Sequence, residues 1–122
     1  PEEPAICLLC GETLCAGTSC CKVMGVGALT RHAAECGEGC GVFLIVHKCA
    51  VVTLRGPHAA YAPGLYVDDF GEEDSGLKRG RPLSLSWPRL ARLQKMVTTH
   101  QVAESVVRER SMASRVIRDG HW

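Results

Sequence analysis

The chain has 122 residues, a formal net charge of +1 and 46% hydrophobic residues, but only two each of Trp, Tyr and Phe. This composition predicts one small domain with an aliphatic core. No apolar run reaches bilayer length and no segment resembles a signal peptide, which argues against a membrane protein and a secretory leader. Because the first residue is Pro1 rather than Met, we expect the chain to be a piece of a longer protein.

Four metal-binding side chains occur in two pairs in the first third of the chain. Two residues separate Cys7 from Cys10, and three separate His32 from Cys36. The first spacing places two thiolates on one tight turn, and the second places two ligands one helical turn apart, which is typical of a structural zinc site. Zinc contributes about 10–16 kcal/mol to the folding of zinc-finger peptides, enough to stabilise a segment with few apolar side chains. The sequence therefore predicts a bound Zn²⁺ ion.

Other cysteines leave the number of zinc ions open at one or two. The chain has eight Cys, seven of them within the first 40 residues. Cys15, Cys20 and Cys21 are further candidate ligands, and with His32 they could hold a second zinc if Cys40 completed the first site. A disulfide scaffold is the competing interpretation, but the paired spacing and the adjacent cysteines favour metal. Thiolate ligands indicate a reducing compartment, cytoplasmic or nuclear.

Residues 5–41 are predicted to form a glycine-rich metal knot. Within it, a short helix from Leu29 to Cys36 would end at Gly37 and present two of the four ligands on one face. The knot is expected to lack the apolar content of an independent core. Its structure should therefore depend on the metal.

Two β-branched runs follow, at residues 42–46 and 49–54. They predict an antiparallel hairpin with both faces covered, one by the metal knot and one by a later helix. Residues 65–67 are a short third strand candidate, and residues 82–86 return as an edge strand. Residues 42–86 thus form a small sheet, and the fold class is α+β.

An acidic loop interrupts this sheet region. Five carboxylates precede three basic side chains: Asp68, Asp69, Glu72, Glu73 and Asp74, then Lys78, Arg79 and Arg81. The spacing lacks the alternating ligands and closing glutamate of an EF-hand. We therefore interpret the loop as a surface latch held by internal ion pairs.

A long amphipathic helix is predicted over residues 87–118, with Ser86 as its N-cap and an end near Arg110 or as late as Arg118. Residues 81–122 carry eight basic and three acidic side chains. A solvated helix face that packs on an acidic surface explains this better than a nucleic-acid interface.

No catalytic constellation is recognisable. Glu35 lies beside Cys36, but the order of motifs is reversed relative to zinc deaminases. His47 and Cys49 share a strand face without a third orienting group, so we interpret Cys49 as a core residue. The metal site is accordingly expected to be closed and structural.

Several blocks of the sequence together resemble the C-terminal domain of UBR-type E3 ubiquitin ligases, the N-recognins of the N-degron pathway. The blocks are Cys7-Leu-Leu-Cys10-Gly11, Cys15, Cys20-Cys21, His32-x3-Cys36-Gly37-x-Gly39 and the segment from Tyr66 to Leu83. The resemblance covers about residues 5–100. Cys40 and Cys49 fall outside the pattern.

The resemblance implies a zinc-stabilised scaffold and interaction module of a RING-type E3 ligase, in a region associated with autoinhibition in some members. A separate UBR box binds the degron and a separate RING domain recruits the E2. The expected partner is the rest of the parent ligase, with ubiquitin, E2 or substrate complexes as further partners. A weaker similarity to zinc-finger UBP domains implies an alternative, the binding of a ubiquitin tail or peptide.

Overall fold

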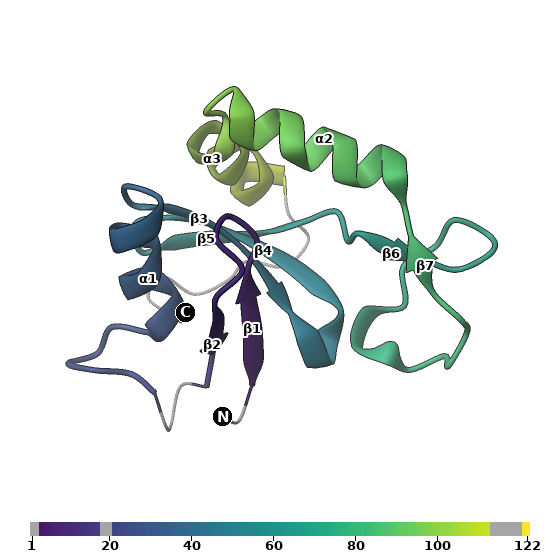
Figure 1. Cartoon of the computed structure of the whole chain (residues 1–122), viewed down its shortest axis with the longest axis horizontal. Coiled ribbons are helices and arrows are strands. Elements are labelled where there is room, and N and C mark those ends of the chain that lie inside the picture. The colour runs from purple at the N-terminus through teal and green to yellow at the C-terminus, as the bar shows by residue number, and fades with distance from the viewer. Residues whose placement is uncertain (1–2, 18–20, 113–120) are drawn as a thin grey trace.

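The computed structural model describes residues 3–17, 21–112 and 121–122 (Figure 1). Its elements in chain order are β1 (Pro4–Cys7), β2 (Thr13–Cys15), α1 (Ala28–Cys36), β3 (Cys40–Ile45), the 3-10 turn η1 (Val46–Lys48), β4 (Ala50–Arg55), β5 (His58–Ala62), β6 (Tyr66–Val67), η2 (Ser75–Leu77), β7 (Ser84–Leu85), α2 (Trp87–Thr98) and α3 (Val102–Met112). The predicted α+β class is confirmed. No helix in the described ranges is long and apolar enough to cross a bilayer.

Five antiparallel strands form the central sheet in the order β2-β1-β3-β4-β5. The predicted hairpin is confirmed as β3 and β4, with Phe43 opposite Val52. The predicted metal knot is not a separate layer, because it contributes β1 and β2 to this sheet. β5 was not predicted: it is rich in alanine, and its pairing with β4 depends on the tight turn at Gly56, where φ is +55°.

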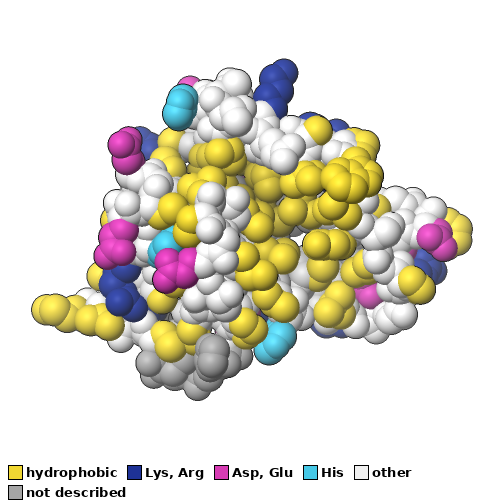
Figure 2. All heavy atoms as spheres, in the orientation of Figure 1, with side chains coloured by type: hydrophobic (Ala, Val, Ile, Leu, Met, Phe, Trp, Pro, Cys, Tyr) yellow, Lys and Arg dark blue, Asp and Glu magenta, His cyan; other side chains and the backbone are white. Residues whose placement is uncertain are grey.

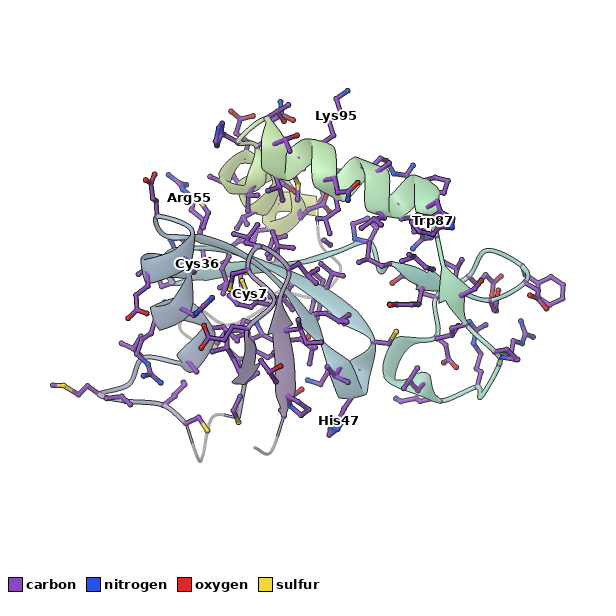
Figure 3. All side chains as sticks on the ribbon, in the orientation of Figure 1. Cys7, Cys36, His47, Arg55, Trp87 and Lys95 are labelled. Atoms are coloured by element: carbon purple, nitrogen blue, oxygen red, sulfur yellow. The ribbon has the colours of Figure 1, made fainter. Side chains whose placement is uncertain are left out.

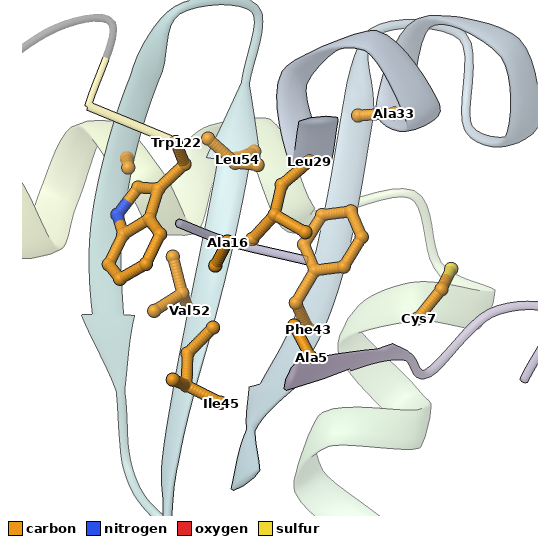
Figure 4. Close-up of a cluster of buried hydrophobic side chains, with 11 residues drawn as sticks. Ala5, Cys7, Ala16, Leu29, Ala33, Phe43, Ile45, Val52, Leu54 and Trp122 are labelled. Atoms are coloured by element: carbon orange, nitrogen blue, oxygen red, sulfur yellow. The ribbon is translucent and has the colours of Figure 1, made fainter. Parts of the chain in front are cut away.

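Both faces of the sheet are covered, as the apolar strands predict. On β3, the side chains of Phe43 and Ile45 join a core on the α1 side, and those of Val42 and Leu44 join a core beneath α2 and α3 (Figures 1 and 4). This alternation follows from the two-residue period of a strand. The α1 side supports the candidate site described below.

The predicted single C-terminal helix is wrong, because α2 and α3 are separate helices. α2 ends at Thr98, and His100 adopts a left-handed conformation with φ +57°, which stops a helix. The break lets both helices pack on the same face of the sheet (Figure 1). The N-cap is confirmed: the Ser86 side chain accepts a hydrogen bond from the Arg89 N–H at 3.4 Å. Residues 113–118 of the predicted helix lie outside the described residues.

The acidic loop is held by buried carboxylates, as the latch interpretation predicts. Asp68 Oδ1 accepts hydrogen bonds from the N–H groups of Phe70 (2.8 Å) and Glu72 (3.0 Å), and Asp68 Oδ2 pairs with Arg81 at 3.2 Å. These bonds, the one to Glu72 N–H above all, lower the pKa of Asp68. The loop is therefore ordered by its own charges.

A second set of contacts joins this loop to the helical layer. Arg79 pairs with Glu72 at 2.9 Å, and its N–H donates to Asp74. Arg89 of α2 pairs with Glu73 at 2.8 Å and donates to the Gly64 carbonyl at 3.0 Å. The loop thus fixes the start of α2 relative to the sheet.

Replacing Asp68 with Asn should lower the thermal unfolding midpoint at pH 7. Because the pKa of Asp68 is lower in the folded state, its contribution is present above the ordinary aspartate pKa of about 4 and is lost as pH falls through the folded value. Asp68→Asn should therefore also weaken the loss of stability in acid. Thermal unfolding from pH 7 to pH 2 measures both effects, with the exposed Asp69→Asn as the matched control. Equal curves for the two variants would contradict this role.

Candidate metal centre

The four predicted ligands converge between the β1–β2 turn and α1. Each of Cys7, Cys10, His32 and Cys36 offers one ligand atom, and these atoms all lie within 4.8 Å of one another. Cys10 Sγ and His32 Nε2 lie 3.3 Å apart. Figure 3 shows Cys7 and Cys36 on neighbouring elements with their side chains close together. Three sulfurs and one imidazole are a donor set typical of structural zinc.

The turn that follows β1 places the sulfurs of Cys7 and Cys10 toward α1. The Cys7 carbonyl accepts a hydrogen bond from the Gly11 N–H at 2.7 Å, and the Cys7 N–H donates to the Glu12 carbonyl at 2.9 Å. Gly11 has φ +84°, a conformation that other residues rarely adopt. The Leu8 N–H donates to the Val42 carbonyl at 2.8 Å and ties the turn to β3.

Close packing on β3 fixes the position of α1. Leu29 and Ala33 are buried on the helix face that meets the sheet. A Cβ on Gly41 would lie 2.5 Å from the Phe43 ring and 3.1 Å from the Ala33 Cβ, so only glycine permits this approach. His32 is buried and its ring meets that of Phe43 edge to face at a centroid distance of 6.2 Å.

The close approach of the thiols shifts the pKa of two of them in opposite directions. The backbone N–H of Glu12, helped by His32, lowers the pKa of Cys10 to about 7. Desolvation and the neighbouring Cys10 raise the pKa of Cys36 to about 11. Thiols this close oppose one another's ionisation, and a bound divalent cation would favour the thiolate form.

Glu12 supplies the outer contact that metal-bound histidines usually have. Its Oε2 lies 3.3 Å from His32 Nδ1, and the opposite nitrogen, Nε2, faces Cys10. A carboxylate on one imidazole nitrogen fixes the tautomer and leaves the other nitrogen free to bind metal. Glu12 was not predicted as part of the site, although its place directly after Cys10-Gly11 could have indicated it.

The other cysteines that the structure describes are not members of this group. Cys15 and Cys21 are half-buried and do not belong to it, and Cys20 lies outside the described residues. Cys40 packs with the core beneath α2, so it does not complete the site. His32 lies in the first group, so a second ion held by Cys15, Cys20 and Cys21 would need a different fourth ligand.

Cys49 is half-buried at the end of η1, in a left-handed conformation with φ +49°. Burial, with smaller contributions from the charges of Glu73 and Asp74, raises its pKa. It is therefore a poor nucleophile. Its interpretation as a core residue on a strand is wrong, because it lies at a turn before β4 and belongs to neither core cluster.

Comparison with known proteins identifies the family. The profile of the family described as Proteolysis_6 C-terminal matches residues 1–99. The chain belongs to this family of UBR-type C-terminal domains. It is similar to the E3 ubiquitin-protein ligase UBR2 of Mus musculus, with 41% identity over 111 residues, 86% of this chain and 6% of that protein. No solved structure matches the chain.

Two further relatives have similar names and similar coverage. The E3 ubiquitin-protein ligase Ubr3 of Drosophila melanogaster is 41% identical over 105 residues, 86% of this chain and 5% of that protein. The ligase ubr1 of Schizosaccharomyces pombe is 44% identical over 89 residues, 73% of this chain and 4% of that protein. The chain thus spans about a twentieth of the length of the curated relatives it matches. The resemblance to UBR-type ligases is confirmed.

Replacing Glu12 with Gln should weaken Zn²⁺ affinity about 10-fold, since outer-shell partners of metal-bound histidines contribute 10- to 100-fold. The amide keeps the shape but cannot hold the imidazole by charge. Competition with a coloured chelator measures the affinity. Glu35→Gln is the matched control, because it removes the same charge from an exposed position on α1. Equal affinities of the two variants would remove Glu12 from the site.

Proposed function

We propose that this domain is a zinc-stabilised scaffold and interaction module of a RING-type E3 ubiquitin ligase that recognises N-degrons. The single observation that carries the proposal is the convergence of Cys7, Cys10, His32 and Cys36 in a chain that belongs to this family. Since the relatives named as E3 ligases are some twenty times longer, the domain serves as one part of a large enzyme.

Zinc in this site would be structural. Three thiolates and one imidazole complete a tetrahedron, so they leave no coordination position for water or substrate. When bound, the ion supplies a crosslink between the β1–β2 turn and α1. Cys7 would anchor it from the buried side and Cys10 from the solvent side. Glu12 orients the imidazole, and no residue of the group has a catalytic task.

An apolar groove beneath α2 is the surface that we propose for docking on the parent ligase. It has a volume of about 200 Å³, and its lining residues are Leu8, Val42, Leu65, Leu90, Leu93, Gln94, Val97 and Thr98. Figure 2 shows apolar side chains gathered across the face below α2. Because most of a ligase of the relatives' length lies outside this chain, the proposed occupant is an apolar segment of the same protein.

The UBP-like alternative has less support from the aromatic side chains. Phe43 and Trp122 are buried in the core and cannot line an open pocket. Phe70 is exposed on the acidic loop with Arg81 over its ring, and Trp87 is exposed at the start of α2. Titration of ubiquitin into the domain tests the alternative directly, since micromolar binding would favour it over the scaffold.

Replacing Cys10 or Cys36 with Ser should abolish zinc binding and prevent soluble folding, because the remaining ligands cannot complete a tetrahedron. Native mass spectrometry should show one bound zinc ion in the unmodified chain and none in either variant. Cys49→Ser should keep the ion and the fold. In the full-length ligase, the two ligand variants should reduce turnover of an N-degron reporter and Cys49→Ser should not. Normal zinc content in Cys10→Ser would overturn the assignment.

Placing a charge in the groove should release the domain from the rest of the ligase. Gln94 lines the groove and is exposed, so Gln94→Lys should alter docking without unfolding the domain. Ala91→Lys, exposed on the same helix, is the matched control. Limited proteolysis and crosslinking of the full-length ligase measure release. Identical patterns for both variants would exclude this groove as the docking surface.

A further inference from the structure

Trp122, the last residue of the sequence, lies in the core beside α1. Its side chain is only 2% exposed and is the largest of the fully buried ones. The ring packs in the cluster that contains Leu29, Val52 and Leu54 (Figure 4). The other tryptophan, Trp87, is 71% exposed. The chain end therefore occupies a slot between α1 and the sheet.

The backbone of Trp122 completes the start of α1. Its carbonyl oxygen accepts hydrogen bonds from the N–H groups of Leu29 (3.1 Å) and Thr30 (3.3 Å). The first N–H groups of a helix need acceptors, and the N-cap residue Gly27 has no side chain to supply one. The Trp122 carbonyl thus replaces the side-chain oxygen of a Ser or Asp at the N-cap as the acceptor for the first helical N–H groups.

Gly27 provides independent evidence that the slot is shaped for this backbone. A Cβ at this position would lie 1.9 Å from the Trp122 oxygen and 2.0 Å from its carbonyl carbon. Its φ of −70° is open to any residue, so close approach rather than backbone conformation explains the glycine. A side chain at position 27 would displace the tryptophan.

Two side chains outside the core cluster also contact the Trp122 ring. Lys48 Nζ lies 5.6 Å from the Trp122 ring centroid and 3.2 Å from Glu3 Oε1, next to β1. The His121 ring meets the Trp122 ring edge to face at 4.5 Å. Lys48 thus links the Trp122 ring to Glu3, the residue before β1.

We propose that the segment His121–Trp122, which we call the tryptophan clamp, positions the metal centre, with Trp122 as a positioning residue. α1 has nine residues, too few to be stable alone, and it carries two of the four ligands. Trp122 contacts its first turn, and His32 and Cys36 follow on the next two turns. The tryptophan clamp holds these ligands at the distance from Cys7 and Cys10 that zinc requires. This inference rests on the proposed zinc site.

The test measures Zn²⁺ affinity by chelator competition, the Co²⁺ absorption spectrum and hydrogen exchange of the α1 amides. Trp122→Ala and Gly27→Ala should each weaken zinc affinity at least about 10-fold and alter the Co²⁺ spectrum. Trp87→Ala is the matched control and should change nothing. The indole Nε1 has no hydrogen-bond partner among the described residues. Trp122→Phe therefore changes only the ring, and it should weaken binding by less.

A stability control separates positioning from a general loss of packing. Val51 is fully buried on the opposite face of the sheet, so Val51→Ala destabilises the domain without touching α1. Its zinc affinity should fall much less than that of Trp122→Ala. Zinc affinity and Co²⁺ spectra equal to the unmodified chain in Trp122→Ala and Gly27→Ala would overturn the role of Trp122 in positioning the ligands. A fall in affinity in Val51→Ala as large as that in Trp122→Ala would overturn it as well. Absence of zinc binding in the unmodified chain would instead overturn the proposed function.

Discussion

The junction between the β1–β2 turn and α1 is the contact on which the rest of the domain depends. Cys7 and Cys10 approach His32 and Cys36 there, with all four ligand atoms within 4.8 Å. Little apolar surface covers this junction, since Cys10 and Cys36 are exposed. α1 packs on β3 through Leu29 and Ala33, so what lacks packing is the contact between the turn and the ligand-bearing end of the helix. A crosslinking cation is the interaction that would hold this contact.

Two features outside the ligand set extend the junction into the fold. Glu12, an exposed residue, contacts the His32 imidazole and orients it. Trp122 accepts hydrogen bonds from the first turn of α1, the helix that carries His32. The helical layer is organised separately, by the buried carboxylates of the acidic loop and the ion pair from Glu73 to Arg89. The domain thus has two polar clusters that hold its layers together around an aliphatic sheet, the metal-ligand junction and the acidic loop. The groove beneath α2 lies between them and is the surface proposed to meet the parent ligase.

Much of this architecture was predictable because the determinants are local in sequence. Ligand spacing, the Gly37 stop of α1 and the β-branched hairpin each depend on a few neighbouring residues. Features that depend on distant contacts were not predictable in this way. The alanine-rich β5 is a strand only because β4 offers an edge, and Trp122 is a cap only because α1 lacks one. The break at His100 was also missed, because the apolar periods of α2 and α3 join smoothly.

Exhaustive chelation of the purified chain under reducing conditions tests whether zinc holds the β1–β2 turn to α1. Hydrogen exchange and circular dichroism would follow the metal-free chain. We expect β1, β2 and α1 to lose protection and the chain to cease to be compact, and we expect added Zn²⁺ to restore both. A metal-free chain that stays compact, with α1 as protected as before, would contradict this expectation.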